Sequence, residues 1–327
     1  GMQPLKEKLL TRSLNYYQRM SAAQGGRADL SSELAMNHFR VGSITDEIGS
    51  VEDAEHHFVK SAALQQTLLA EKPDDEELLY ALGNSWNALG RVRMQTGDLP
   101  GAEEAFGNAQ ATREKLAKGH PKNVEYQRKL ANVLMNEGLL AARRNQPEQA
   151  AQDYESAQKI RRDVLKTEQN DDVARDYGKG AFNLADLALN RGQFEQAAEL
   201  CRDAIAHFEP LVKKYPDSLA DQAQLAAAYF MLADVLQLLE ETDPALEYYA
   251  KSQARLQMLT DENPRVAEFR ERLVTNLIGQ AQLRELQGQA AAGNAADDPE
   301  ALKASRNYYE NGESALKQSV RELEMLL

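Results

Sequence analysis

The five histidines are the residues of this chain that could ligate a metal ion. They are His38, His56, His57, His120 and His207. A zinc site on a helix needs two ligands four residues apart and a third ligand nearby, and no pair of these histidines has that spacing. His56 and His57 are adjacent, so on a helix their side chains point about 100° apart. We therefore expect solvated or partly packed histidines and no bound metal.

No set of residues predicts a catalytic centre either. The sequence has no GxSxG turn, no Gly-rich phosphate loop and no nucleophile beside a recognisable base. Its single cysteine, Cys201, rules out an internal disulfide framework and is compatible with a reducing cytoplasm. We expect Cys201 to be an inert packing group, and the protein to have no cofactor and no enzymatic activity.

Five alanines show that the chain is built from repeats. Ala54, Ala102, Ala150, Ala197 and Ala245 stand 48, 48, 47 and 48 residues apart. A large position follows each alanine by four residues and is Phe58, Phe106, Tyr154, Cys201 or Tyr249. A small position precedes each alanine by twelve residues and is Gly42, Gly90, Gly138, Ala185 or Ala233. Repeats of this kind stack on one another and leave one long binding surface, so the pattern favours an interaction protein.

Each repeat contains the signals for two helices and a turn. Five residues before each alanine stands Gly49, Gly97, Asn145, Gly192 or Glu240. Glycine or asparagine at that point suits a left-handed helix cap. Nineteen residues after four of the alanines stands a proline, which ends the second helix. We therefore expect every repeat to be a helix, a turn and a helix.

The second repeat carries a recognisable motif. It contains W-x2-L-G followed by A-x3-F-x2-A, formed by Trp86, Leu89, Gly90, Ala102, Phe106 and Ala109. This pattern resembles the tetratricopeptide repeat (TPR), and the resemblance covers about residues 30 to 288. TPR units are normally about 34 residues long, so each helix here has gained about two turns. The resemblance implies an all-α fold, a right-handed α-α superhelix or TPR-like solenoid of antiparallel helix pairs.

We expect one TPR-like solenoid over residues 1–327. Residues 3–24 would be the orphan second helix of a truncated repeat, and five repeats would cover 28–73, 74–121, 122–170, 171–216 and 217–264. The final repeat, 265–327, would contain an inserted loop at about 289–299, because this stretch is rich in Ala, Gly, Asn and Asp and lacks apolar spacing. Since the array begins in the middle of a repeat, we also expect the native polypeptide to continue upstream of Met2.

One acid stands where the repeats expect an aliphatic side chain. Glu137 is aligned with Val41, Leu89, Leu184 and Leu232. It is either a buried acid reserved for a partner, or a carboxylate that pairs with a neighbouring arginine or reaches the edge of the array. We favour the second interpretation.

The TPR resemblance places the first helix of each repeat on a concave groove. The residues that it assigns to the groove are Asn84, Asn87, Arg91, Asn132, Met135, Asn136, Lys179, Phe182, Asn183, Asp186, Phe230 and Asp234. Asparagine and arginine can hydrogen-bond a peptide backbone or a terminal carboxylate, and the two phenylalanines supply apolar anchors. The asparagines could instead simply solvate the groove. The favoured hypothesis is a scaffold that binds a peptide or protein segment in this groove.

The charge and the hydropathy of the sequence argue against nucleic acid and membranes as partners. A net charge of -13 opposes nucleic-acid binding, and no apolar run reaches the roughly 18 residues of a membrane span. We expect a cytoplasmic protein.

The alternative function is an oligomerisation or regulatory module. The long repeat and its GxxEEA-like turn at 192–197 resemble arrays attached to some bacterial serine/threonine kinases and, more weakly, kinesin light chain repeats. Homo-oligomers would form through the exposed faces of the terminal helices, residues 5–20 and 316–327.

Overall fold

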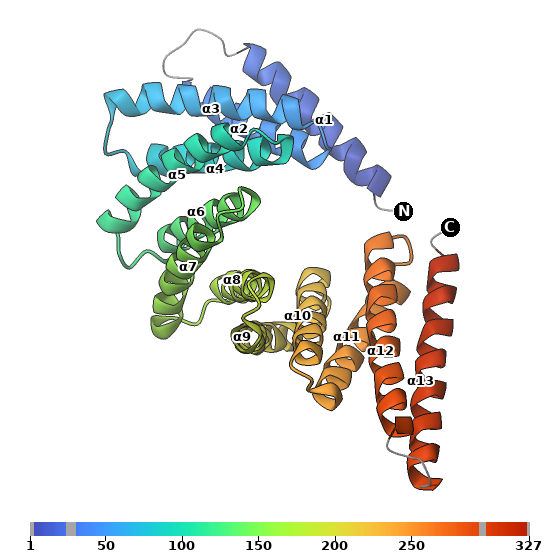
Figure 1. Ribbon diagram of the computed structural model, residues 1–327. Coiled ribbons are helices and arrows are strands. Elements are labelled where there is room, and N and C mark those ends of the chain that lie inside the picture. The colour runs from blue at the N-terminus through green and yellow to red at the C-terminus, as the bar shows by residue number, and fades with distance from the viewer. Residues whose placement is uncertain (1–2, 24–30, 294–298, 326–327) are drawn as a thin grey trace. The chain divides into compact units, whose positions relative to one another are not determined.

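The computed structural model describes residues 3–23, 31–293 and 299–325, and these residues fold into thirteen helices without a strand among them (Figure 1). The helices are α1 (Gln3–Ala23), α2 (Ser31–Glu47), α3 (Val51–Glu71), α4 (Glu76–Thr96), α5 (Leu99–Gly119), α6 (Val124–Arg143), α7 (Pro147–Thr167), α8 (Asp171–Asn190), α9 (Phe194–Lys214), α10 (Leu219–Leu238), α11 (Thr242–Glu262), α12 (Ala267–Gly293) and α13 (Pro299–Glu324). Within the described ranges, no helix is both long and apolar enough to cross a membrane.

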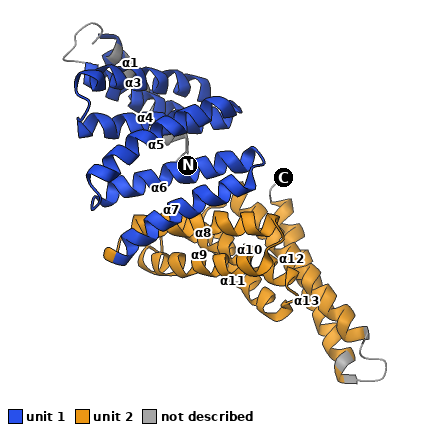
Figure 2. Cartoon of the chain, turned by 60° about the vertical axis from the view of Figure 1, so that its left-hand side comes forward, with its two compact units in different colours: residues 1–166 blue, residues 167–327 orange. Residues whose placement is uncertain are grey.

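The chain forms two compact units, residues 1–166 and 167–327 (Figure 2). In unit 1, each helix from α1 to α5 packs on the next one in sequence. In unit 2, the same holds from α8 to α12, and α8 also touches α10, which touches α12. In unit 1, α2 likewise touches α4, which touches α6. Within each unit, the first helices of successive pairs therefore lie side by side, as a solenoid of helix pairs requires.

The small and large positions of each repeat pack against one another. A Cβ atom added to Gly90 would lie 2.5 Å from the ring of Phe106, and one added to Gly138 would lie 2.4 Å from the ring of Tyr154. Real Cβ atoms do not approach so closely, so the aromatic ring requires glycine opposite it. The five repeat alanines and the five large residues are all buried. The sequence pattern thus identified the core of each helix pair.

The turn between the paired helices is left-handed in all five repeats. Gly49, Gly97 and Gly192 have φ values of 91°, 85° and 72°. Asn145 and Glu240 fill the same position with φ values of 58° and 61°. The expected left-handed cap is therefore confirmed. Glu240 adopts it despite a side chain that disfavours this backbone region.

The predicted loop at about 289–299 is wrong in its first part, because α12 continues to Gly293. Residues 289–292 are glutamine and three alanines, and alanine has the highest helix propensity of all residues. Extending α12 through them is therefore favourable although they do not fit the repeat pattern. Residues 294–298 of the predicted loop lie outside the described residues. Helix α13 begins at Pro299, a position where proline costs no hydrogen bond.

Candidate functional site

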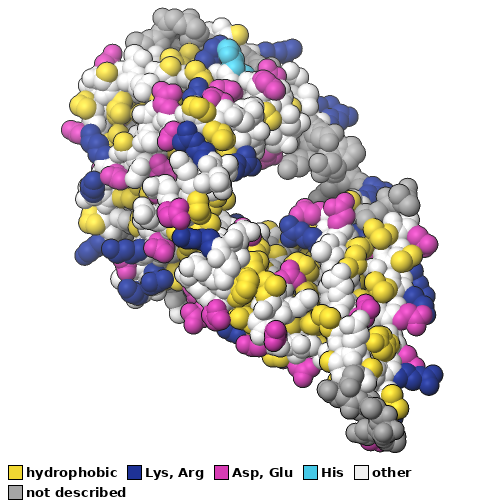
Figure 3. Space-filling model, viewed as in Figure 1, with side chains coloured by type: hydrophobic (Ala, Val, Ile, Leu, Met, Phe, Trp, Pro, Cys, Tyr) yellow, Lys and Arg dark blue, Asp and Glu magenta, His cyan; other side chains and the backbone are white. Residues whose placement is uncertain are grey.

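Unit 2 contains a pocket of about 600 Å³, which we call the Phe182–Phe230 pocket. Its apolar lining consists of Phe182, Leu189, Ala226, Ala227, Phe230, Met231 and Leu256. Its polar lining consists of Asp186, Gln224, Asp234, Glu268, Glu271, Arg272 and Thr275. Figure 3 shows hydrophobic side chains gathered over α8 and α10 with acidic ones beside them. The lining combines apolar side chains with charged ones, as ligand sites commonly do.

Helices α8 and α10 contribute equivalent residues to this pocket. Phe182 and Phe230 stand 48 residues apart at the same point of adjacent repeats, and each is followed four residues later by Asp186 or Asp234. Residues four apart lie on the same face of a helix. All four of these residues were assigned to the groove from sequence, and the structure brings all four to one pocket.

Tyr249, which is buried on α11, supports the two α10 residues of the pocket. Its hydroxyl donates a hydrogen bond to Asp234 Oδ1. The Tyr249 hydroxyl oxygen also lies 3.1 Å from Gln237 Oε1. The rings of Phe230 and Tyr249 meet edge to face with their centroids 5.8 Å apart. Burial raises the pKa of Asp234, and the hydrogen bond from Tyr249 opposes this shift. Asp234 is thus held in place without a cation.

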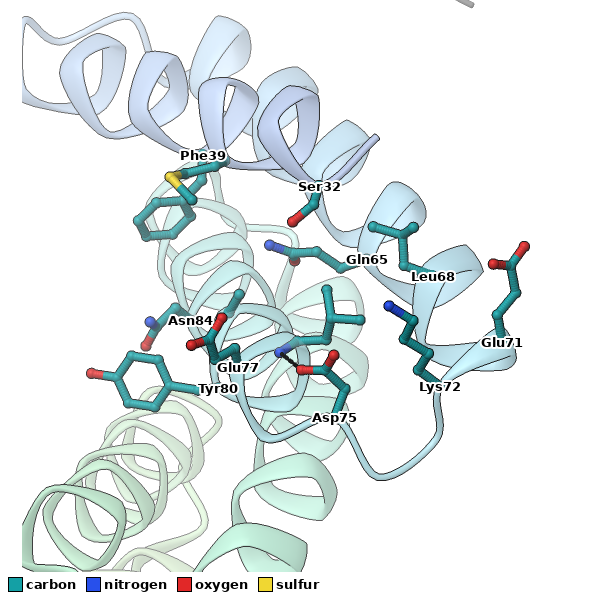
Figure 4. A pocket seen from close by; sticks show the side chains of 13 residues that line it. Ser32, Phe39, Gln65, Leu68, Glu71, Lys72, Asp75, Glu77, Tyr80 and Asn84 are labelled. Carbon is teal, nitrogen blue, oxygen red and sulfur yellow. Dashed lines mark hydrogen bonds between the residues drawn. The ribbon is translucent and has the colours of Figure 1, made fainter. Parts of the chain in front are cut away.

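Unit 1 contains a second pocket, of about 560 Å³, between α2, α3 and α4 (Figure 4). Met36, Phe39, Leu68, Leu78 and Ala81 supply its apolar surface, and Gln65 and Asn84 are among its polar residues. Gln65 is only 3% exposed, yet its Oε1 accepts no hydrogen bond from the described part of the chain. An unpaired buried carbonyl costs about 1–3 kcal/mol. A ligand N–H group that reached Gln65 would therefore bind favourably.

Buried arginines orient the asparagines of unit 1. Arg113 on α5 donates hydrogen bonds to Gly83 O at 3.1 Å and to Asn84 Oδ1 at 3.0 Å. One repeat later, Arg161 on α7 donates to Asn132 Oδ1 at 2.9 Å. Because arginine can only donate, each asparagine must turn its oxygen inward, which leaves its NH2 group to face elsewhere. Arg113 and Arg161 were not singled out from the sequence.

A sequence signal for these arginines does exist. Gln65, Arg113 and Arg161 are spaced by 48 residues and occupy one aligned position, which is Phe208 and Leu256 in the later repeats. A polar residue at a position that is elsewhere apolar marks a place where a buried hydrogen-bonding group is needed.

The remaining groove residues lie outside both pockets. They are Asn87, Arg91, Asn132, Met135, Asn136, Lys179 and Asn183. Asn136 Nδ2 donates to Asn87 Oδ1 at 2.8 Å, and Arg91 forms an ion pair with Asp46 at 2.9 Å. Met135 is only 7% exposed, whereas Lys179 is exposed.

Glu137 does not pair with an arginine of the described chain, so that part of the favoured interpretation is wrong, and the other part, a carboxylate that reaches the edge of the array, stays a prediction. Glu137 is half-buried and forms no ion pair within the described ranges. Glu137 and Arg144 both line a third pocket, of about 310 Å³, in unit 1, but Arg144 pairs with Glu103 at 2.7 Å. Burial raises the pKa of Glu137 to about 7, and the nearby charges of Asp153 and Glu114 add to the shift.

His38 and Cys201 are buried, His57 and His207 are half-buried, and His56 and His120 are exposed. His38 Nδ1 lies 2.9 Å from His57 Nδ1, and burial lowers the pKa of His38 to about 4. Among the residues that the structure describes, no group of three or more possible ligands surrounds a metal position. Burial raises the pKa of the Cys201 thiol to about 12, which disfavours the reactive thiolate.

No protein-family model matches the sequence, and no curated protein is a significant match. Solved structures do match. The nuclear import adaptor Nro1 of S. pombe has a TM-score of 0.60 at 13% identity, over 91% of this chain and 98% of that one. A signal transduction ATPase with a tetratricopeptide repeat sensor from Pyrococcus horikoshii has a TM-score of 0.53 at 14% identity, over 97% of this chain and 53% of that one.

The fold is a TPR-like helical repeat array. The Rap conjugation gene regulator of plasmid pLS20, solved with a Phr peptide, also matches this TPR-like array, with a TM-score of 0.50 at 15% identity over 100% of this chain and 73% of that one. Such low identities establish the fold alone. These neighbours lend no support to the predicted link with a kinase.

Proposed function

We propose that this TPR-like array is a scaffold that binds a peptide or protein segment, with the Phe182–Phe230 pocket as its main contact. One observation carries the proposal: adjacent repeats present equivalent, partly exposed phenylalanines in one pocket of about 600 Å³. Aromatic anchors in such pockets commonly dominate the energy of protein recognition. The Rap regulator with its Phr peptide and the import adaptor Nro1 support the proposal, because both share this fold.

The other groove residues of unit 2, Lys179 and Asn183, would contact the flanks of the segment that the Phe182–Phe230 pocket binds. Asn183 would hydrogen-bond its backbone. Asn183→Ala should weaken partner capture without lowering the melting temperature much, because this side chain is partly exposed. Unchanged capture would move the backbone contacts to other residues.

Affinity capture from a lysate of the source cell, read by mass spectrometry, tests the function. The bait is the full chain, compared with Phe182→Ala/Phe230→Ala. The control is Leu219→Ala/Leu238→Ala, which truncates two exposed leucines at the ends of α10. The proposal expects partners that the wild type and the control retain and the phenylalanine variant loses. Equal capture by all three proteins would contradict it.

A second candidate function is homo-oligomerisation through the terminal helices. Leu302, Tyr309, Leu316 and Leu323 follow one another at seven-residue spacing along α13 and are 42% to 55% exposed. Residues seven apart lie on one helix face, so they form an exposed apolar stripe of the kind that pairs helices. Light scattering over a range of concentrations tests this role. A dimer that Leu316→Asp abolishes would support it, and a strict monomer would exclude it.

We also propose that the protein is cytoplasmic, because its single cysteine is buried and unpaired, which suits a reducing compartment. Fractionation of the source cell tests it.

A further inference from the structure

The Phe182–Phe230 pocket contains the same two-residue arrangement twice. In both α8 and α10 a phenylalanine is followed one helical turn later by an aspartate, as Phe182 with Asp186 and as Phe230 with Asp234. Residues at this spacing are neighbours on the helix surface. Each helix therefore presents an aromatic ring and a carboxylate side by side.

This arrangement is particular to unit 2. The aligned residues of unit 1 are Phe39 with Ser43, Asn87 with Arg91, and Met135 with Leu139. None of these pairs combines an aromatic ring with an acid. The Phe–Asp pairs are therefore not a requirement of the repeat fold, which forms without them in unit 1.

Negative charge in the pocket exceeds positive charge. Four carboxylates and one guanidinium line it. The guanidinium of Arg272 is already paired with Glu268 at 2.7 Å. Asp186, Asp234 and Glu271 have no ion pair with any described residue. The pocket thus holds three carboxylates whose charge no cation of the described chain balances.

Asp234 is the most firmly positioned of these three acids. Tyr249 donates a hydrogen bond to it from α11. A Cβ atom at Gly279 on α12 would lie 2.9 Å from the Tyr249 hydroxyl oxygen, so glycine is needed there to leave Tyr249 in place. A carboxylate accepts several hydrogen bonds, and the hydroxyl of Tyr249 supplies one. Asp234 therefore retains acceptor capacity for an incoming cation.

We propose that the Phe182–Phe230 pocket binds a partner segment that carries Lys or Arg side chains beside apolar ones. This inference rests on the proposed scaffold function and names the chemistry of the partner. The methylene stem of Lys or Arg can lie against a phenylalanine ring while its charged end meets the adjacent aspartate. An acidic segment would be repelled, and a wholly apolar one would bury carboxylates without partners, which is costly.

Selection of short random peptides displayed on phage tests the inference. The target is the full chain, with counter-selection on Phe182→Ala/Phe230→Ala. We expect enriched peptides in which Lys or Arg stands next to Leu, Ile or Phe. The affinity of such a peptide, measured by fluorescence anisotropy, should fall as salt rises, because charges near the surface are screened.

Two variants with the same change of net charge isolate the pocket. Asp186→Asn/Asp234→Asn should weaken the basic peptide about tenfold, and the amide oxygen at 234 still accepts from Tyr249. Glu195→Gln/Asp217→Asn removes two exposed charges outside the pocket lining and should leave the affinity unchanged. Glu271→Gln is a further variant of the pocket. Because Glu271 is exposed on α12, this change should leave the fold intact, and it should weaken binding of the basic peptide about two- to threefold.

Three results would overturn the inference, and they separate it from the scaffold function. Enrichment of acidic or uncharged peptides would refute the basic partner and leave the scaffold intact. Equal affinity of the wild type and the aspartate variant for a basic peptide would do the same. A selection with no enrichment over the phenylalanine variant would refute both proposals.

Discussion

Glu137 offers the sharpest test of the energetics of this fold. The perturbation is Glu137→Gln, which removes the charge and keeps the size of the side chain. Burial, with Asp153 and Glu114, raises the pKa of Glu137 from 4.5 to about 7. A carboxyl whose pKa is higher in the folded state binds its proton more tightly there. The contribution of Glu137 to the stability of the fold is therefore most favourable below pH 4.5, and it is lost as the pH rises through 7.

The size of the effect follows from the pKa shift. Each pKa unit corresponds to about 1.4 kcal/mol, so the full shift is worth up to about 3 kcal/mol. Partial exposure of Glu137 reduces this, and we expect about 1–3 kcal/mol. At pH 8 the Glu137→Gln variant should exceed the wild type in free energy of unfolding by this amount. Near pH 4 the two proteins should be equal, because the carboxyl is then protonated in both states.

Urea unfolding at several pH values, followed by circular dichroism, measures the difference. Glu155→Gln, which removes an exposed charge on α7, is the control and should show no such pH dependence. Asp153 also has a raised pKa, so some pH dependence should remain in the Glu137 variant. A Glu137→Gln protein that is no more stable than the wild type at pH 8 would show that burial of the Glu137 carboxylate does not destabilise the fold.

Three further predictions concern stability. Gly90→Ala should destabilise the protein by about 1–3 kcal/mol in a thermal melting experiment, because the new methyl group meets the Phe106 ring. Gly107→Ala is the control, and it should be neutral or stabilising because the space around Gly107 is open. Glu240→Gly should stabilise by about 1 kcal/mol in urea unfolding, because it relieves a left-handed residue, and an unchanged midpoint would count against this strain. Since burial lowers the pKa of His38 to about 4, stability should fall between pH 6.5 and 4 by up to about 3 kcal/mol, and His38→Gln should flatten that part of the pH profile.

The repeat spacing predicted the core well because an aligned residue meets the same neighbour in every repeat. Gly90 faces Phe106 and Gly138 faces Tyr154 in the same way, so a comparison of the repeats is enough to pair them. The left-handed turns were predictable for the same reason.

Features that occur once were harder to predict. Helical spacing places Met135 on one side of its helix, but spacing does not say how far the neighbouring helices cover it. The residues next to Arg113 do not show that it is buried, because its partners are carbonyl oxygens from distant parts of the chain, and only its alignment with Gln65 and Arg161 gives a signal. The composition of residues 289–293 predicted a loop, although alanine also extends a helix readily.

The central claim is that the Phe182–Phe230 pocket holds a segment of a partner protein. Site-specific incorporation of a photo-crosslinking phenylalanine analogue at Phe230 tests this directly, with the same analogue at the exposed Leu238 of α10 as the control. After illumination in lysate, we expect the analogue at 230 to crosslink to a discrete protein segment rich in Lys or Arg and apolar residues, and the control to form no such crosslink. Crosslinks to that protein from 238 and none from 230 would contradict the claim.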